Sequence, residues 1–237
     1  MSELARLAEQ HGVMLHTAAS AQQQAQWLAQ RITKALQEAL LARGCATLAL
    51  SGGRSPIPLL QALNLIELAW EQVGITLVDE RWVPPEHAES NAGLLWRHMP
   101  QVMSRVHWQP LYHGTGAAPD AERSSAALQT WLPLDVVVLG MGSDGHTASL
   151  FPGMEGLAAA LSRHAEVPCL SCQAPDGRQR LTLTGAALHS ARLQLLAIRG
   201  EDKAGTLTAA LAGGRPEWPV SAFLRPPLQI VYSADAS

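Results

Sequence analysis

The sequence lacks the marks of several protein classes. No apolar run reaches the length needed to span a membrane, and the N-terminus has neither the basic nor the apolar stretch of a secretory signal. Charged residues make up only 16% of the chain and the formal net charge is −3, which gives no electrostatic case for nucleic-acid binding. We therefore expect a cytoplasmic protein that binds neither membranes nor nucleic acid and that holds any anionic ligand with local groups.

Cysteine is also scarce. The chain has three cysteines, an odd number that does not make a disulfide framework. Cys169 and Cys172 form a C-x-x-C pair, but no second pair accompanies them and no helix start follows to lower a thiol pKa. We interpret both as small residues in or beside a strand, and no spacing of His, Asp or Glu indicates a metal site.

Two common fingerprints are absent from the chain, and a third is absent from the loop at 51–55. The chain has no G-x-x-x-x-G-K-[ST] phosphate loop, and the loop SGGRS at 51–55 is not G-x-G-x-x-G, so a mononucleotide-binding module is disfavoured. The chain has no G-x-S-x-G elbow, so a serine nucleophile is unsupported.

Short apolar strands alternate with helical segments along the chain. The longest helix is expected at 21–43, with Gly44 as its stop and an apolar stripe on one face. Strands are expected at 47–50, 74–78, 110–113, 135–139, 167–171, 180–183, 193–198 and 228–232. Helices are expected at 56–63, 91–99 after the cap Ser90, 120–131, 185–189 and 203–211, and a surface connection at 216–227. The alternation predicts one α/β domain over residues 1–237, with an open, mainly parallel, Rossmann-like sheet and helices on both faces.

The most informative stretch is LDVVVLGMGSDGHTASLFPG, residues 134–153. A buried strand ends there in a loop with three glycines, which can take positive φ and let a ligand approach the backbone. Asp144 and His146 close this loop, and a helix is expected from Thr147. Because His titrates near neutral pH and a carboxylate can orient it, we interpret Asp144 and His146 as a catalytic pair. The remaining histidines are assigned no role.

A second loop should meet the first, because all parallel strands end at the same edge of the sheet. It leads into a helix whose first amides can bind an anion, with Arg54 as a bidentate phosphate ligand. A simple tight turn at the two glycines is an equal alternative. The candidate residues of this loop are Ser51, Gly52, Gly53, Arg54 and Ser55.

Charged residues also follow the strand at 74–78. Asp79, Glu80 and Arg81 would lie at the same edge, where an arginine can stabilise a developing oxyanion, so we expect a role for Arg81 and for at least one carboxylate. Further along the chain, Arg180 and Lys203 could each reach a phosphate, although a solvated surface charge is as good an interpretation.

Four segments carry a family resemblance: SGGRSP, VDERWVPPEHAESNAG, GMGSDGHTASLFPG and RQRLTLTGAAL. In this order and spacing they resemble the 6-phosphogluconolactonase branch of the glucosamine-6-phosphate isomerase/6-phosphogluconolactonase family, over nearly the whole chain. The resemblance implies a glucosamine-6-phosphate deaminase-like fold and hydrolysis of 6-phospho-D-glucono-1,5-lactone to 6-phospho-D-gluconate, the second step of the oxidative pentose phosphate pathway. It also implies a small-molecule substrate and no cofactor or metal, and we expect a monomer or a weak homodimer.

The resemblance and the residues together give a mechanistic hypothesis. His146 would activate water as general base, Asp144 would orient the imidazole or the substrate, and Arg81 would stabilise the oxyanion. The phosphate would lie on the loop amides, helped by Arg180 and Lys203. The family loop usually reads S-G-G-S-T-P, whereas this chain has Arg54-Ser55. The difference keeps the backbone amides but leaves the side-chain contacts at these two positions open.

Two rival functions are considered. The deaminases of the family read D-G-H-I-A-F-N-E-P, and their glutamate would fall at Phe151 here, while their usual tyrosine is replaced by Arg81; both differences favour the lactonase. A non-catalytic sugar-phosphate sensor could keep the phosphate loop but dispense with His146, so the intact pair with Asp144 argues against it.

Overall fold

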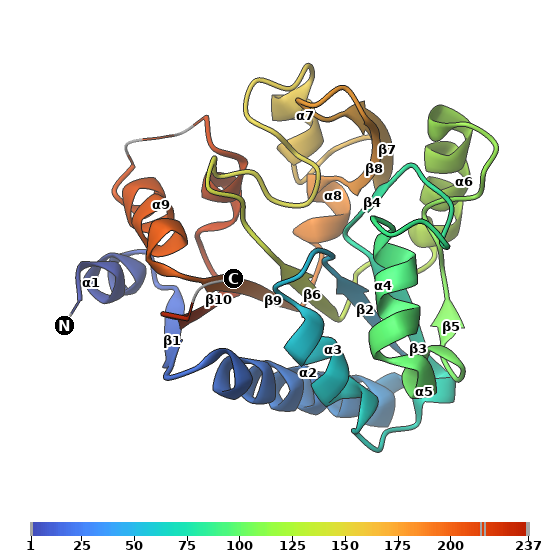
Figure 1. The fold of residues 1–237 in the computed structure, drawn as a ribbon, viewed down its shortest axis with the longest axis horizontal. Coiled ribbons are helices and arrows are strands. Elements are labelled where there is room, and N and C mark those ends of the chain that lie inside the picture. Colours follow the sequence, from blue (N-terminus) through green and yellow to red (C-terminus); the bar gives the residue numbers. More distant parts are fainter. Residues whose placement is uncertain (1, 214, 216, 236–237) are drawn as a thin grey trace.

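A parallel β-sheet forms the centre of the molecule (Figure 1). The computed structural model describes residues 2–213, 215 and 217–235. Within them the main sheet has seven strands, and every pair of neighbouring strands is parallel. Their order across the sheet is β1 (Met14–Ala18), β10 (Leu228–Ser233), β9 (Leu193–Arg199), β6 (Val136–Leu139), β2 (Ala46–Leu50), β3 (Val73–Leu77) and β5 (His107–Trp108). The predicted α/β class with a mainly parallel sheet is confirmed.

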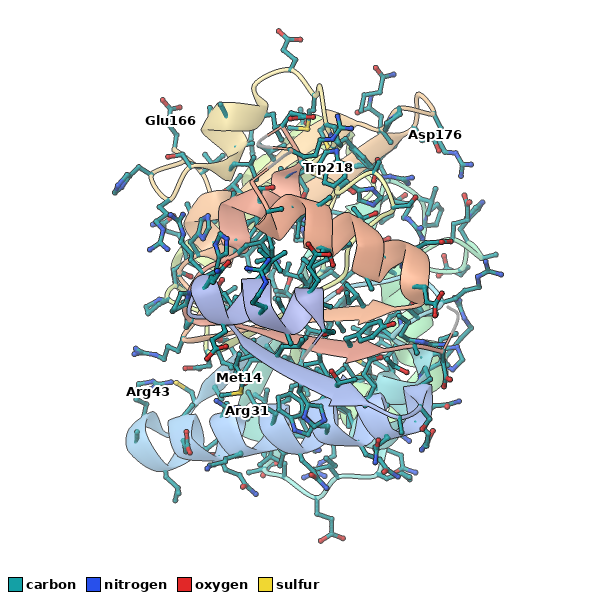
Figure 2. All side chains as sticks on the ribbon, turned by 90° about the vertical axis from the view of Figure 1, so that its left-hand side faces the viewer. Met14, Arg31, Arg43, Glu166, Asp176 and Trp218 are labelled. Atoms are coloured by element: carbon teal, nitrogen blue, oxygen red, sulfur yellow. The ribbon has the colours of Figure 1, made fainter. Side chains whose placement is uncertain are left out.

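Helices cover both faces of this sheet. The side view in Figure 2 shows the sheet between the long helix α2 below and helices α1 and α9 above. The helices of the main layer are α1 (Glu3–Gln10), α2 (Ala21–Arg43), α3 (Ile57–Asn64), α4 (Asn91–His98), α5 (Pro100–Met103) and α9 (Glu201–Leu211). All four residues of the central strand β6 are buried, as expected for a strand covered on two sides.

A smaller antiparallel sheet lies beside the main one. It contains β4 (Asp79–Arg81), β8 (Gln179–Leu183) and β7 (Cys169–Gln173), in that order. The three charged residues that follow the strand expected at 74–78 therefore form a strand of their own. The chain leaves the main sheet at Val78. The Val78 N–H donates to the Leu50 carbonyl next to β3 in the main sheet, whereas the Val78 carbonyl accepts from the Leu183 amide at the end of β8. Helices α6 (Ala117–Gln129), α7 (Leu157–Leu161) and α8 (Gly185–Leu188) complete this part.

Local capping signals fixed several helix ends. Ser20 accepts a hydrogen bond from the Gln23 amide at 3.1 Å, and Gly44 ends α2 in the left-handed conformation with φ 73°. Ser90 caps α4 by accepting from the Gly93 amide at 3.0 Å. The predicted bounds of α2 and the predicted cap of α4 are confirmed.

Three local predictions were wrong. The strand expected at 110–113 is instead the two-residue β5. No helix begins at Thr147, because residues 147–150 form a turn closed by a Thr147–Leu150 bridge, with Ala148 at φ 50°. The connection expected on the surface at 216–227 contains the 3-10 helix η2 (Pro219–Phe223), which buries Val220 and Phe223. Pro216 itself lies outside the described residues. A second 3-10 helix, η1 (Trp70–Gln72), precedes β3.

No helix within the described residues combines the length and apolar character needed to cross a bilayer.

Candidate active site

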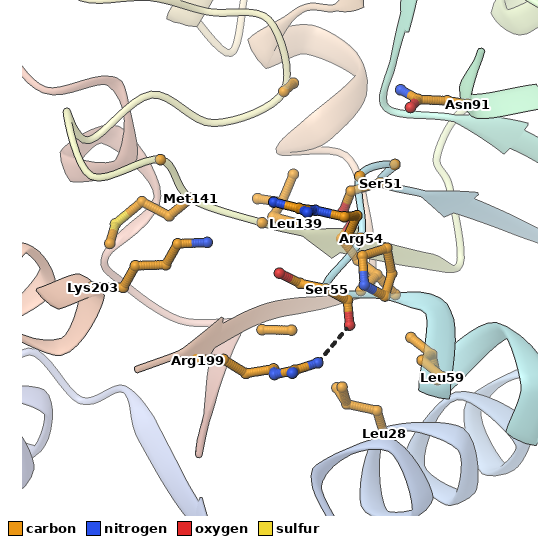
Figure 3. A pocket seen from close by; sticks show the side chains of 18 of the residues that line it. Leu28, Ser51, Arg54, Ser55, Leu59, Asn91, Leu139, Met141, Arg199 and Lys203 are labelled. Carbon is orange, nitrogen blue, oxygen red and sulfur yellow. Dashed lines mark hydrogen bonds between the residues drawn. The ribbon is translucent and has the colours of Figure 1, made fainter. Parts of the chain in front are cut away.

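A pocket of about 320 Å³ lies at the carboxyl edge of the main sheet (Figure 3). Its lining includes the loops after β2 and β6, strand β4, the carboxyl end of β9 and the first turn of α9. Most of the candidate residues line it: Ser51, Gly52, Gly53, Arg54, Ser55, Asp79, Arg81, His146 and Lys203. The structure therefore brings together the loops that the sequence predicted to meet. Asp144 and Arg180 are not among the lining residues.

Asp144 nevertheless holds the imidazole of His146. Its Oδ1 lies 2.6 Å from His146 Nδ1 and accepts from the His146 amide at 3.2 Å. Because a carboxylate accepts hydrogen bonds, this contact favours the neutral tautomer that has its proton on Nδ1 and its lone pair on Nε2. The side chain of His146 is 34% exposed, which allows it both to face the pocket and to reach water.

Glycine is required next to this pair. A methyl group at Gly142 would lie 2.3 Å from two ring atoms of His146 and 2.6 Å from Asp144 Oδ1. The loop closes on itself, since the Gly142 amide donates to the His146 carbonyl at 2.9 Å. On its outer side, Gly145 at φ 78° packs so closely on Trp218 that a side chain there would collide. These contacts, rather than a helix N-terminus, fix the position of His146.

The loop after β2 has the features of an anion site. Ser51 Oγ donates to the Val138 carbonyl at 2.6 Å, which ties this loop to β6. Gly53 has φ 88°, and no side chain caps the start of α3 after Pro56. An uncapped helix start leaves backbone N–H groups available to an anionic ligand.

Asn91 connects this loop to the charged strand β4. A methyl group at Gly52 would overlap the Asn91 carboxamide, 1.8 Å from Oδ1. The same Oδ1 accepts from Arg81 Nη1 at 3.2 Å, and Asn91 Nδ2 donates to the Asp79 carbonyl at 2.9 Å. Ser149 Oγ donates to Asp79 Oδ2 at 2.6 Å. Asn91 was not predicted as a site residue, and only its position after the cap of α4 could have indicated it.

Glu80 has a structural role at the base of the site. Its carboxylate is fully buried and accepts from the amides of Arg81, Asn91 and Ala92 at 2.7–2.8 Å and from Ser90 Oγ at 3.1 Å. Burial raises the pKa of this carboxyl, and the hydrogen bonds oppose the shift. Glu80 therefore fixes the N-terminus of α4 and the backbone of Arg81.

Arg180 lies near Arg81 and Asp79. Its Cα pairs with that of Arg81 between β8 and β4. The residue is only 9% exposed, and its Nη1 has no hydrogen-bond partner within the described residues. Burial, followed by the positive charge of Arg81, lowers the pKa of the Arg180 guanidinium.

Arg199 is a pocket residue that the sequence prediction missed. It ends β9, and its Nη1 donates to the Ser55 carbonyl at 3.1 Å (Figure 3). Lys203, in the first turn of α9, lines the same pocket. The signal was present in the sequence, because Arg199 directly follows an apolar strand that ends at the functional edge.

None of the three cysteines lines the pocket. Cys169 and Cys172 are free and belong to β7, so their interpretation as residues of a strand is confirmed. Burial raises the pKa of each thiol to about 12. Among the described residues, no three His, Cys, Asp or Glu side chains are grouped as metal ligands.

Comparison with known proteins identifies the family. The family model of glucosamine-6-phosphate isomerases/6-phosphogluconolactonase matches residues 19–231. The chain belongs to this family. A 6-phosphogluconolactonase of Pseudomonas aeruginosa is 46% identical over 224 residues, covering 92% of this chain and 94% of that protein. The crystal structure of a 6-phosphogluconolactonase from Shewanella baltica has a TM-score of 0.88 at 33% identity, covering 94% of this chain and 98% of that chain.

The fold prediction is confirmed by the same comparisons. The 6-phosphogluconolactonase structure from Thermotoga maritima, at 21% identity, has a TM-score of 0.80 and supports the fold alone. The family resemblance drawn from the four sequence segments is likewise confirmed by the family model and by the Pseudomonas aeruginosa relative.

Proposed function

We propose that this protein hydrolyses 6-phospho-D-glucono-1,5-lactone to 6-phospho-D-gluconate, the second step of the oxidative pentose phosphate pathway. The family and the names of its relatives support a lactonase. The observation that carries the chemical proposal is the contact of 2.6 Å between Asp144 and His146, on the wall of a pocket that also holds an anion-binding loop and several cations.

The reaction needs one base and one oxyanion stabiliser. His146 Nε2 takes a proton from water as the water oxygen attacks the lactone carbonyl carbon, and Asp144 stabilises the imidazolium that forms. Arg81 stabilises the negative charge on the carbonyl oxygen. When the intermediate collapses, the ring C–O bond breaks and the imidazolium returns its proton to the departing ring oxygen. Water is thus added across the ester bond, and His146 ends neutral.

The other end of the substrate would lie on the loop after β2. The amides of Gly52–Ser55 and the cations Arg54 and Lys203 hold the phosphate, which places the lactone carbonyl near His146. Asp79, fixed by Ser149, binds a substrate hydroxyl or serves as the alternative base. For Arg180 we propose a supporting role: its charge lies beside Asp79 and Arg81, so it strengthens the positive field at the carbonyl end.

One contact also disfavours the deaminase reaction. Phe151 occupies the position where the deaminase motif has glutamate, and its ring centroid lies 4.9 Å from that of His146. An apolar ring at this place cannot transfer a proton.

The test compares hydrolysis of freshly generated 6-phosphogluconolactone by the wild type, by His146→Ala and by a control, His164→Ala, whose side chain is exposed and outside the pocket. The spontaneous rate is subtracted in each case. We expect strong acceleration by the wild type and the control and near-background rates for His146→Ala. Acceleration that survives in His146→Ala would assign the base to another residue, Asp79 first. No acceleration by the wild type would refute the lactonase and favour a sugar-phosphate sensor, and release of ammonia from glucosamine 6-phosphate would indicate a deaminase.

A further inference from the structure

Asn91 lies where the loop after β2 meets the charged strand β4. It is the first residue of α4, it is only 2% exposed, and it lines the pocket. Figure 3 shows Asn91 and Lys203 on different sides of Ser51, so Asn91 lies at the end of the pocket away from Lys203. Its backbone N–H donates to Glu80 Oε1 at 2.8 Å, which leaves the side-chain carboxamide as the group that acts in the pocket.

The orientation of this carboxamide is set by its neighbours. Asn91 Nδ2 donates to the Asp79 carbonyl at 2.9 Å, and because a carbonyl can only accept, the other atom of the carboxamide must be the oxygen. That oxygen, Oδ1, accepts from Arg81 Nη1 at 3.2 Å. A methyl group at Gly52 would lie 1.8 Å from Oδ1, so glycine is needed there to leave room for the carboxamide. These contacts hold Asn91 Oδ1 in one place, facing Arg81.

One nitrogen of Arg81 carries both of its side-chain anchors. Nη1 donates to the Glu89 carbonyl at 2.5 Å and to Asn91 Oδ1 at 3.2 Å, which uses both of its N–H groups. Within the described part of the chain, the Arg81 guanidinium makes no further hydrogen bond. Because the guanidinium is planar, two anchors on Nη1 restrict its plane and leave the N–H groups of Nε and Nη2 to a ligand in the pocket that Arg81 lines.

Both anchors are uncharged. Asn91 presents an amide oxygen and Glu89 a backbone carbonyl, and among the described residues Arg81 forms no ion pair. The Glu89 carboxylate contacts Arg178 instead, and the hydrogen bond from Arg178 is the largest cause that lowers the pKa of Glu89. The Glu80 carboxylate accepts from backbone amides. The neutral anchors therefore hold the guanidinium without the partial cancellation of its charge that a carboxylate anchor would cause.

We propose that Asn91 is a positioning residue for the reaction: its carboxamide orients the Arg81 guanidinium toward the lactone carbonyl and, being uncharged, leaves the positive charge of Arg81 to the oxyanion. This proposal rests on the lactonase function and on the role of Arg81 proposed above. Asn91 acts through Arg81, and no bond forms or breaks at Asn91 itself.

The kinetic test compares Asn91→Ala with the matched control Asn64→Ala. Asn64 lies outside the pocket at the end of α3, and its Oδ1 accepts from the Gln101 amide at 2.9 Å. We expect Asn91→Ala to lower kcat for 6-phosphogluconolactone about 10- to 100-fold, the effect of losing one hydrogen bond to a charged group, with KM within about threefold of the wild type. Asn64→Ala should keep wild-type kinetics, and thermal unfolding is recorded for each protein. A folded Asn91→Ala protein with kcat within about threefold of the wild type would overturn the proposal.

A binding measurement shows whether Asn91 acts through Arg81. Calorimetry gives the affinity for 6-phosphogluconate, whose C1 carboxylate is anionic as the oxyanion is, and for sorbitol 6-phosphate, which has a neutral C1 hydroxymethyl group instead. Asn91→Ala should weaken 6-phosphogluconate binding about tenfold and sorbitol 6-phosphate binding less than about twofold. In an Arg81→Ala background the same substitution should have no further effect, because its interaction partner is gone. Equal weakening for both ligands, or the same loss with and without Arg81, would overturn the proposal and leave Asn91 as a structural residue.

Asn91→Asp tests the neutral character of the anchor and replaces Asn91→Ala if that variant does not fold. Aspartate keeps the size of the side chain and an oxygen that faces Arg81, but it adds a negative charge. It should lower kcat and the 6-phosphogluconate affinity at least as much as Asn91→Ala. Wild-type values in Asn91→Asp would overturn the proposal, since a charged anchor would then serve as well.

The two measurements separate this proposal from the proposed function. If the wild type hydrolyses no lactone, the proposed function fails, yet a loss of 6-phosphogluconate affinity in Asn91→Ala that depends on Arg81 would still support the positioning role. Hydrolysis by the wild type with unchanged kinetics and binding in both Asn91 variants would keep the function and overturn this proposal. A wild type that neither hydrolyses the lactone nor binds 6-phosphogluconate would overturn both.

Discussion

Replacing Gly142 by alanine should displace His146, the proposed general base, without unfolding the protein. Gly142 does not have a positive φ, so its backbone can accommodate alanine. The added methyl would lie 2.3 Å from Cε1 and Nδ1 of His146. Carbon atoms in contact are normally about 3.5–4.0 Å apart, so the imidazole would have to move by about 1.2–1.7 Å.

That movement should be costly for catalysis. A misplacement of about 1 Å can reduce a rate about 10²-fold, so we expect kcat for 6-phosphogluconolactone to fall about 100-fold, equivalent to about 2.7 kcal/mol of activation free energy. The same methyl would lie 2.6 Å from Asp144 Oδ1, so the imidazole cannot move while its contact with the carboxylate stays unchanged. KM should change little, because the loop at residues 51–55, the proposed phosphate site, is not touched.

The assay is steady-state hydrolysis with subtraction of the spontaneous rate, together with thermal unfolding. The control is Gly205→Ala in α9, where a methyl would meet nothing within 4 Å and alanine favours the helix. Gly205→Ala should retain wild-type kinetics. The reasoning would be refuted by a folded Gly142→Ala protein whose kcat stays within about threefold of the wild type, since His146 could then not require its present position.

Two stability predictions follow from buried polar groups. Burial lowers the pKa of His189 from 6.5 to about 4, so the unfolded state binds its proton first and stability falls as pH drops from 6.5 to 4. The free energy of unfolding is measured by urea denaturation near pH 7.5 and pH 5 for the wild type and for His189→Asn. The decrease between the two pH values should be about 1 kcal/mol smaller in His189→Asn, and an equal decrease in both proteins would contradict the prediction. Ser90→Ala removes the side-chain oxygen that accepts from the Gly93 amide and the hydroxyl that donates to Glu80. We expect the free energy of unfolding to fall by about 1–2 kcal/mol and Tm by about 3–6 °C. An unchanged Tm would show that solvent replaces both hydrogen bonds.

The helix and strand ends that carry local signals could be predicted. Ser20 and Gly44 delimit α2 because a side-chain cap and a left-handed glycine act within one turn of the helix. The helix expected at Thr147 failed for the opposite reason. The Ser149 amide donates to Thr182 Oγ1 at 3.2 Å, and Thr147 Oγ1 donates to the Gly140 carbonyl at 2.8 Å, so contacts with other segments outweigh local helix propensity.

The predicted site likewise combines residues that chain order could place with residues that only tertiary packing places. His146 and the Ser51–Ser55 loop could be placed at one edge from chain order alone, because parallel strands present all their carboxyl ends on the same side. Asn91, which contacts Arg81 and the loop at Gly52, could not, because its role depends on where α4 packs after the chain has left the main sheet.

The sequence by itself determined the α/β alternation, the apolar strands and the chemistry at each strand end, since these depend on periodicity and on residues adjacent in the chain. Only the tertiary structure decided that residues 79–81 form a strand, that Glu80 is buried as the anchor of α4, and that Arg199 enters the pocket while Arg180 stays beside Arg81. These outcomes depend on hydrogen bonds and charges between segments that are distant in sequence, whose energies are fixed only once the sheets have packed.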